Sequence, residues 1–100
     1  MRVVELFAGV GGFRIGFEGP PGGNSEGKHR VVWANQWEPS TKKQHAAEVY
    51  AERWGLESSE SDPEVYLSES GDVLVNKDIG TIPAEEVPDH EILCGGFPCQ

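Results

Sequence analysis

The chain has 100 residues, 37% of them hydrophobic, and a formal net charge of −9. Its length suits one small domain or a part of a larger one. No run approaches the roughly 20 apolar residues that cross a bilayer, and Glu5 lies where a signal peptide would be apolar. The acidic balance argues against a nucleic-acid-binding face within these residues, because phosphates require a basic surface.

Cysteine usage predicts neither a disulfide framework nor a metal site. Cys94 and Cys99 are the two cysteines, and without an export signal we expect a reducing cytoplasm. A zinc site needs about four ligands, and the three histidines lack the spacing that would complete one.

The first half of the chain predicts two strands around a helix. Residues 3–7 are short and rich in β-branched side chains, as in a buried strand. Residues 8–12 predict a tight glycine-rich turn, and residues 13–18 predict a helix. Residues 19–29 predict a loop rich in glycine and proline, and residues 30–35 predict the second strand.

A second helix is predicted over residues 40–54, after Pro39, with Ser40 or Thr41 as its cap. Its predicted apolar face consists of Ala46, Val49, Tyr50 and Trp54.

The rest of the chain predicts a loop and two strands. Residues 55–72 contain six acids and no Lys or Arg, which is typical of a solvated, mobile insertion. Residues 73–75 and 91–94 predict strands, and residues 82–87 predict a helical turn or loop.

This alternation predicts an α/β fold with a mostly parallel sheet of about four strands, within one domain over residues 1–100. In such sheets, ligands bind beyond the carboxyl ends of the strands. Four polar or glycine-rich segments each follow a predicted strand, so we expect them to meet at one edge. They are residues 8–12, 36–38, 76–80 and 95–100.

The turn at residues 8–12 does not fit the dinucleotide fingerprint. A G-x-G-x-x-G pattern starting at Gly9 includes Gly11 and then requires glycine where Arg14 stands. This makes a nicotinamide-dependent oxidoreductase the least favoured function. We interpret the turn as a place of close ligand approach, and close packing of small residues is the alternative.

Two further strand ends carry side chains that suit a nucleoside. Trp37 can stack on a purine, and the carboxylate of Glu38 can hold ribose hydroxyls. Asp78 can accept a hydrogen bond from an exocyclic amine, while Ile79 packs on a flat ring. The alternatives are a helix-entry Glu38 beside a core tryptophan, and a turn-forming Asp78.

Cys99 is the candidate nucleophile. Residues 95–100 read Gly-Gly-Phe-Pro-Cys-Gln, so Pro98 fixes the backbone before the thiol and the glycines allow a tight turn. The reactive thiolate needs help from a cation or a helix N-terminus. Cys94, inside the last predicted strand, is the candidate for an inert core thiol.

In this order, residues 5–13, 35–38, 77–80 and 95–100 resemble the first four motifs of the cytosine-5 DNA methyltransferase family. The resemblance spans the chain apart from its two loops. It implies the N-terminal half of a Rossmann-like domain that binds S-adenosylmethionine (SAM) and is cut just after its nucleophile.

The resemblance implies that Cys99 is catalytic, that Trp37 stacks on adenine and that Asp78 bonds the adenine amino group. The family usually has an acid where Gln36 stands, so either Gln36 or Glu38 holds the ribose. The implied cofactor positions are Phe7, Ala8, Gly9, Gly11, Gly12, Gln36, Trp37, Glu38, Asp78, Ile79 and Pro98.

The implied reaction methylates C5 of cytosine in double-stranded DNA, through addition of the Cys99 thiolate to C6 of a flipped base. The resemblance favours a prokaryotic restriction–modification enzyme in the cytoplasm, associated with the nucleoid. The family's remaining motifs and target-recognition region are not among these residues, so we expect the chain alone to be inactive. Two alternatives stay open: a tRNA cytosine-5 methyltransferase, and a non-catalytic SAM-binding subunit that pairs with a second chain.

Overall fold

The computed structural model describes residues 1–9, 11–18, 29–39 and 43–95. In chain order these residues form β1 (Arg2–Leu6), α1 (Gly12–Glu18), β2 (Arg30–Asn35), α2 (His45–Trp54), β3 (Glu57–Ser58), β4 (Val65–Leu67), β5 (Val73–Val75), the 3-10 turns η1 (Ile79–Thr81) and η2 (Ala84–Glu86), and β6 (Ile92–Gly95). In this part of the chain, no helix has the length and apolar character needed to cross a membrane.

The strands form one sheet of six, in the order β3-β4-β5-β2-β1-β6. β1 pairs in parallel with β2 and β6, and β2 pairs in parallel with β5, whereas β3 and β4 are antiparallel. The prediction of a mostly parallel α/β fold is therefore confirmed. The four predicted strands are β1, β2, β5 and β6, each within one residue of its predicted bounds.

The prediction of about four strands and of a mobile loop over residues 55–72 is wrong. Residues 57–67 contain an antiparallel hairpin, β3 and β4, which extends the sheet beyond β5. Tyr66 packs against the core on one face of the sheet and Val65 against the core on the other. These two side chains supply the burial that a solvated acidic segment would lack.

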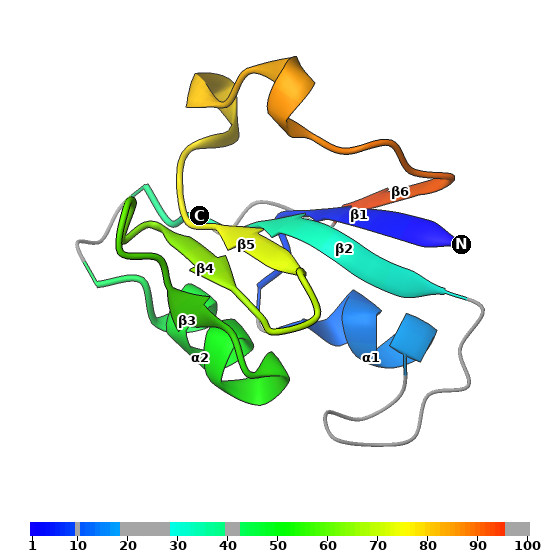
Figure 1. The fold of residues 1–100 in the computed structure, drawn as a ribbon, viewed down its shortest axis with the longest axis horizontal. Coiled ribbons are helices and arrows are strands. Elements are labelled where there is room, and N and C mark those ends of the chain that lie inside the picture. Colours follow the sequence, from blue (N-terminus) through cyan, green and yellow to red (C-terminus); the bar gives the residue numbers. More distant parts are fainter. Residues whose placement is uncertain (10, 19–28, 40–42, 96–100) are drawn as a thin grey trace.

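The sheet separates two layers (Figure 1). Both helices lie on one face, and the chain from β5 to β6, with its two 3-10 turns, crosses the other face. The buried residues on the helix side are Val3, Ala8, Val31, Ala34, Ala47, Tyr50, Ala51, Leu56 and Leu74. Those on the opposite side are Val4, Trp33 and Val75.

Helix α2 begins at His45 rather than at residue 40, and the predicted caps Ser40 and Thr41 lie outside the described residues. The apolar face is also rotated from the prediction, since Val49 is 38% exposed. The buried residues of α2 are Ala47, Tyr50 and Ala51. Gly55 ends the helix with a φ of 68°, a left-handed conformation that glycine adopts without strain.

Candidate functional site

The glycine turn follows β1 at the carboxyl edge of the parallel strands. Phe7 has a φ of 52°, and among the described residues no other non-glycine residue has a positive φ. Holding a phenylalanine there costs about 1 kcal/mol or more. The N–H of Ala8 donates to the carbonyl of Asn35 at 2.9 Å. The turn is thus strained at its start and tied to the end of β2.

The glycines of the turn are small for different reasons. A Cβ on Gly11 would lie 2.1 Å from the ring of Trp54, and Gly11 also has a φ of 92°. A Cβ on Gly9 or Gly12 would meet no atom within 4 Å. Packing therefore explains Gly11, and a φ of 60° favours glycine at position 9 as well, while the space beside Gly9 and Gly12 is open.

Gln36 joins the glycine turn to the end of β2. Its side-chain Oε1 accepts a hydrogen bond from the N–H of Gly9 at 2.7 Å, and its own N–H donates to the carbonyl of Val75. Only 3% of Gln36 is exposed. The residue that replaces the family's usual acid is therefore buried, and its oxygen is committed to the turn.

Gln36 belongs to a group of amide side chains, of which Gln44 was not predicted from the sequence and Asn76 was predicted only as part of the polar segment 76–80. Asn76 Nδ2 donates to the Gln36 carbonyl at 2.7 Å and to Gln44 Oε1 at 3.2 Å. Gln44 bonds both backbone groups of Glu38: it accepts from the N–H at 2.7 Å and donates to the carbonyl at 2.9 Å. We call Asn35, Gln36, Gln44 and Asn76 the carboxamide cluster.

Trp37 and Glu38 are half-buried in the loop that Gln44 holds. Asp78 caps η1, because its Oδ1 accepts from the N–H of Gly80 at 3.0 Å. The turn-forming alternative for Asp78 is thus realised. Since Asp78 is exposed and a carboxylate has two oxygens, this bond is compatible with ligand binding as well. Asn35 fixes Lys77, the residue before Asp78, because Asn35 Nδ2 donates to the Lys77 carbonyl at 2.7 Å.

Pro98 and Cys99 lie outside the described residues, so their predicted roles stay predictions. β6 ends at Gly95, which pairs with Leu6 directly before the glycine turn. Cys94 is half-buried in β6, and burial together with the charge of Glu5 raises the pKa of its thiol. A raised pKa fits the prediction that Cys94 is inert, because only the thiolate is reactive.

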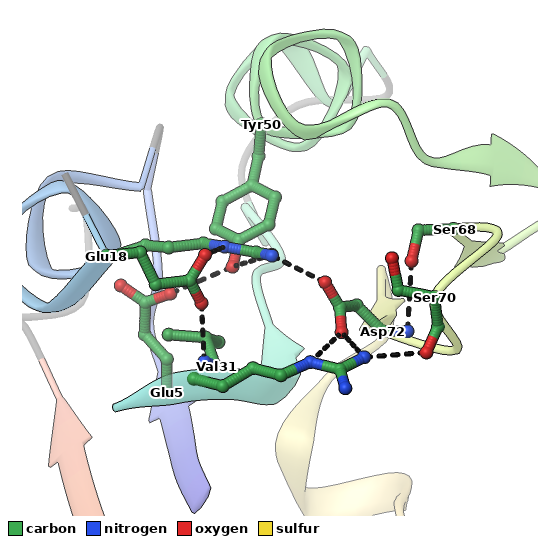
Figure 2. A network of polar contacts seen from close by, with 9 residues as sticks. Glu5, Glu18, Val31, Tyr50, Ser68, Ser70 and Asp72 are labelled. Carbon is green, nitrogen blue, oxygen red and sulfur yellow. Dashed lines mark hydrogen bonds and ion pairs between the residues drawn. The ribbon is translucent and has the colours of Figure 1, made fainter. Parts of the chain in front are cut away.

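A buried charged network lies on the helix side of the sheet (Figure 2). Arg14 of α1 donates to Asp72 at 2.6 Å, to Glu18 at 3.0 Å and to the Tyr50 hydroxyl at 3.3 Å. The Tyr50 hydroxyl donates to Glu5 Oε1 at 3.0 Å. The network therefore connects both sides of the glycine turn, β1 before it and α1 after it.

Asp72 joins this buried network to Arg30, whose side chain is half exposed. It accepts from the guanidinium groups of both Arg14 and Arg30, and Arg30 also donates to the carbonyl of Ser70 at 2.6 Å. Asp72 is only 6% exposed. Its interpretation as part of a solvated acidic run is wrong, because two cations from other elements neutralise it.

Glu5 is the unusual member of the network. It is fully buried, and its Oε2 has no hydrogen-bond partner among the described residues. Burial raises the pKa of Glu5 to about 7, although the Tyr50 hydrogen bond and the charge of Arg14 act in the opposite direction. Glu5 therefore changes protonation near neutral pH.

A cavity of about 660 Å³ opens on the face opposite the helices. Leu6, Ile79 and Leu93 are among its mostly apolar lining residues. Of the predicted cofactor residues in the described ranges, Ile79 lines this cavity, whereas Phe7, Gly9, Trp37 and Asp78 do not. The candidate site is thus defined by the strand ends and their hydrogen bonds, and within the described residues no His, Cys, Asp and Glu cluster could hold a metal.

The fold and the site together define an α/β domain whose strand ends and glycine turn form one polar edge, the arrangement that binds nucleoside ligands in this class. The profile of C-5 cytosine-specific DNA methylases matches residues 1–100. The chain belongs to this family.

Several curated relatives are methyltransferases. The chain is 42% identical to the type II methyltransferase M.Sau3AI of Staphylococcus aureus and 35% identical to M.HhaI of Haemophilus parahaemolyticus, over its whole length in both. It is 29% identical over 99% of its length to a DNA-cytosine methyltransferase of Escherichia coli K12. It covers 20%, 22% and 19% of these relatives, so it spans about a fifth of their length. No solved structure matches the chain.

Proposed function

We propose that these residues are the N-terminal part of a SAM-dependent enzyme that methylates C5 of cytosine in double-stranded DNA, as part of a restriction–modification system. The observation that carries the proposal is the family match over all 100 residues, which includes the segments at all four parallel strand ends. Because type II enzymes act on chromosomal DNA, the proposal includes a cytoplasmic, nucleoid-associated location.

The described residues fit a nucleoside methyl donor. Gly9 and Gly12 leave room for close approach, and Phe7 is held in a costly conformation at the same turn. Trp37 would stack on adenine and the Asp78 carboxylate would accept from its amino group. The donor supplies an electrophilic methyl group. Gly11 needs no ligand to explain it, because Trp54 fills that space.

We assign the nucleophile to Cys99, with Pro98 fixing the backbone before it. The Cys99 thiolate forms a bond to C6 of a cytosine that has left the base stack, and the electron pair moves toward C5. C5 thereby becomes nucleophilic enough to take the methyl group from the sulfonium of the donor, which would leave as a neutral thioether. After a base removes the C5 proton, the bond from sulfur to C6 breaks and the thiolate is regenerated.

A chimera tests the proposal, with residues 1–100 replacing the matching part of M.Sau3AI, the relative to which the chain is 42% identical. We expect SAM-dependent methylation of DNA and a covalent complex with DNA that contains 5-fluorocytosine. Cys99→Ser should abolish both, and Cys94→Ser is the matched control that should keep both. A Cys99→Ser chimera that still forms the complex would overturn the assignment.

The other outcomes separate the alternatives. The chimera takes its target-recognition region from M.Sau3AI, so it tests the chemistry of residues 1–100, whereas the choice between DNA and transfer RNA is decided by offering both substrates to the full-length protein. A folded chimera that binds SAM and methylates neither substrate would favour a non-catalytic subunit. The 100-residue chain alone should transfer no methyl groups in a radiolabelled-SAM assay, and any transfer would contradict its assignment as a part of the enzyme.

A further inference from the structure

We propose that the carboxamide cluster is an uncharged brace that sets the shape of the methyl-donor site, with Gln44 and Asn76 as positioning residues. The inference rests on the proposed function, because it concerns the same site. It adds two residues that lie outside the four sequence motifs, one before α2 and one after β5.

The brace is continuous from the glycine turn to the loop that follows β2. The Gly9 N–H is bonded to Gln36, the Gln36 carbonyl to Asn76, and Asn76 to Gln44. Gln44 then holds the backbone of Glu38 at both its N–H and its carbonyl. Each of these hydrogen bonds has a side-chain amide as a partner, and none involves an ionisable group. Loss of the Gln44 side chain should therefore loosen the bonds between Gln44 and Gly9 at any pH.

The contact between Gln44 and Glu38 is the one that fixes the loop. A neighbouring strand would bond the backbone N–H and carbonyl of Glu38 in the same way, but Glu38 lies beyond the end of β2. Gln44 thus supplies with one side chain the two bonds that the sheet no longer provides. Trp37, the proposed adenine platform, lies directly before the residue held in this way.

Burial makes the geometry strict. Asn35 is 2% exposed, Gln36 3% and Asn76 7%. Buried amides must keep their partners, since an unsatisfied group loses its hydration without compensation. The cluster therefore has few alternative arrangements, and the loops that it connects are ordered before the methyl donor binds. Asn35 adds the third loop, through its bond to the Lys77 carbonyl beside Asp78.

Amide exchange in the 100-residue chain, followed by NMR, tests the brace without any ligand. Gln44→Ala should accelerate exchange of the Glu38 amide by about tenfold or more, because that amide donates to Gln44, and should accelerate the Gly9 amide to a smaller extent. Val65→Ala, in the hairpin, is the control for general destabilisation. Equal effects of the two variants at Glu38 and Gly9 would overturn the brace.

Calorimetry with SAM on the chimera tests the positioning role. Gln44→Ala should weaken SAM binding about tenfold. Val65→Ala should bind SAM like the parent, although its melting temperature falls by a similar amount. In Gln44→Glu the new carboxylate cannot donate to the Glu38 carbonyl, so affinity should fall at pH 7 and recover only below about pH 5, as the carboxyl group gains a proton. The parent should show no such recovery.

The two proposals fail separately. If the parent chimera folds but does not bind SAM, the proposed function fails, and the exchange experiment still decides whether the brace exists. If the parent binds SAM and Gln44→Ala binds it equally well, the positioning role is refuted while the proposed function stands.

Discussion

The buried charged network and the carboxamide cluster both tie the sheet to its helices, and they differ in what they place in the interior. On the helix side of the sheet, Arg14 and Asp72 pair as full charges, and Glu5 Oε2 has no hydrogen-bond partner in the described part of the chain. At the carboxyl edge, neutral amides bond to backbone groups. The stabilising effect of the charged network depends on buried ionised groups that keep their partners, whereas the carboxamide cluster orders its loops with neutral groups whose hydrogen bonds do not change with pH.

The largest effect is expected from Asp72→Asn. It removes the shorter of the two ion pairs of the buried Arg14 guanidinium and leaves Glu18 as its remaining anionic partner, which should lower the free energy of unfolding by about 3 kcal/mol. Urea denaturation followed by circular dichroism measures this. Asp89→Asn, at an exposed site, is the control. A loss below about 1 kcal/mol would mean that the network is not stabilising in the way described.

The next effect is expected from Glu5→Gln, and it depends on pH. Because the pKa of Glu5 is about 7 in the folded chain and 4.5 for an ordinary glutamate, the unfolded chain loses its proton first as pH rises. The free energy of unfolding should therefore fall between pH 4.5 and pH 7 and stay low above that range. The variant should remove this fall and gain about 3 kcal/mol over the parent at pH 8.

Urea titrations at several pH values measure the effect of Glu5→Gln. Glutamine still accepts the Tyr50 hydrogen bond, so the variant tests the ionisation rather than the contact. Glu52→Gln, exposed on α2, should leave the pH dependence as it is. If the free energy of unfolding of the parent, relative to Glu5→Gln, rose between pH 5 and pH 7, the raised pKa of Glu5 would be contradicted.

Gln44→Ala should have a smaller effect on stability, about 1 kcal/mol, because it removes neutral hydrogen bonds at a half-buried site. The loss should be the same at pH 5 and pH 8, in contrast to Glu5→Gln. Parallel denaturation curves at the two pH values measure this. A pH-dependent loss would mean that an ionisable group participates in the carboxamide cluster.

The smallest effect is expected from Asp62→Asn. Asp62 pairs with Lys77, and both side chains are about a third exposed. Lys77 donates to this carboxylate and lowers its pKa, but solvent screens the pair. The melting temperature should not change measurably. A clear decrease would show that an ion pair at the surface supports the sheet as the buried pair of Arg14 and Asp72 does.

Hydrophobic runs were sufficient to predict the four parallel strands, because β1, β2, β5 and β6 are short, apolar and rich in β-branched residues. The hairpin could not be predicted in this way. Both residues of β3, Glu57 and Ser58, are exposed, and the inward-facing Val65 and Tyr66 lie within an acidic segment. The burial that makes this segment a sheet edge comes from residues distant in sequence.

The same limit applies to the site. The three loops after β1, β2 and β5 were predicted to meet because parallel strands end at one edge. Their connection through Gln44 and Asn76 was not, since the two residues are 32 positions apart and show no local pattern. The pairing of Arg14 with Asp72 could not be predicted either, since the two residues are 58 positions apart. In the sequence, Arg14 is distinctive only because it interrupts the glycine fingerprint.

Phe7 shows what folding alone would not select. Glycine would adopt the same φ of 52° without penalty, and the ring of Phe7 is only half-buried. Within the described residues, neither backbone preference nor the two core clusters account for an aromatic side chain at this place. Val3 and Val4 of the preceding strand can be judged by how well they fill the interior, whereas the benzyl group of Phe7 has to be judged by the methyl donor that we propose for the turn it begins.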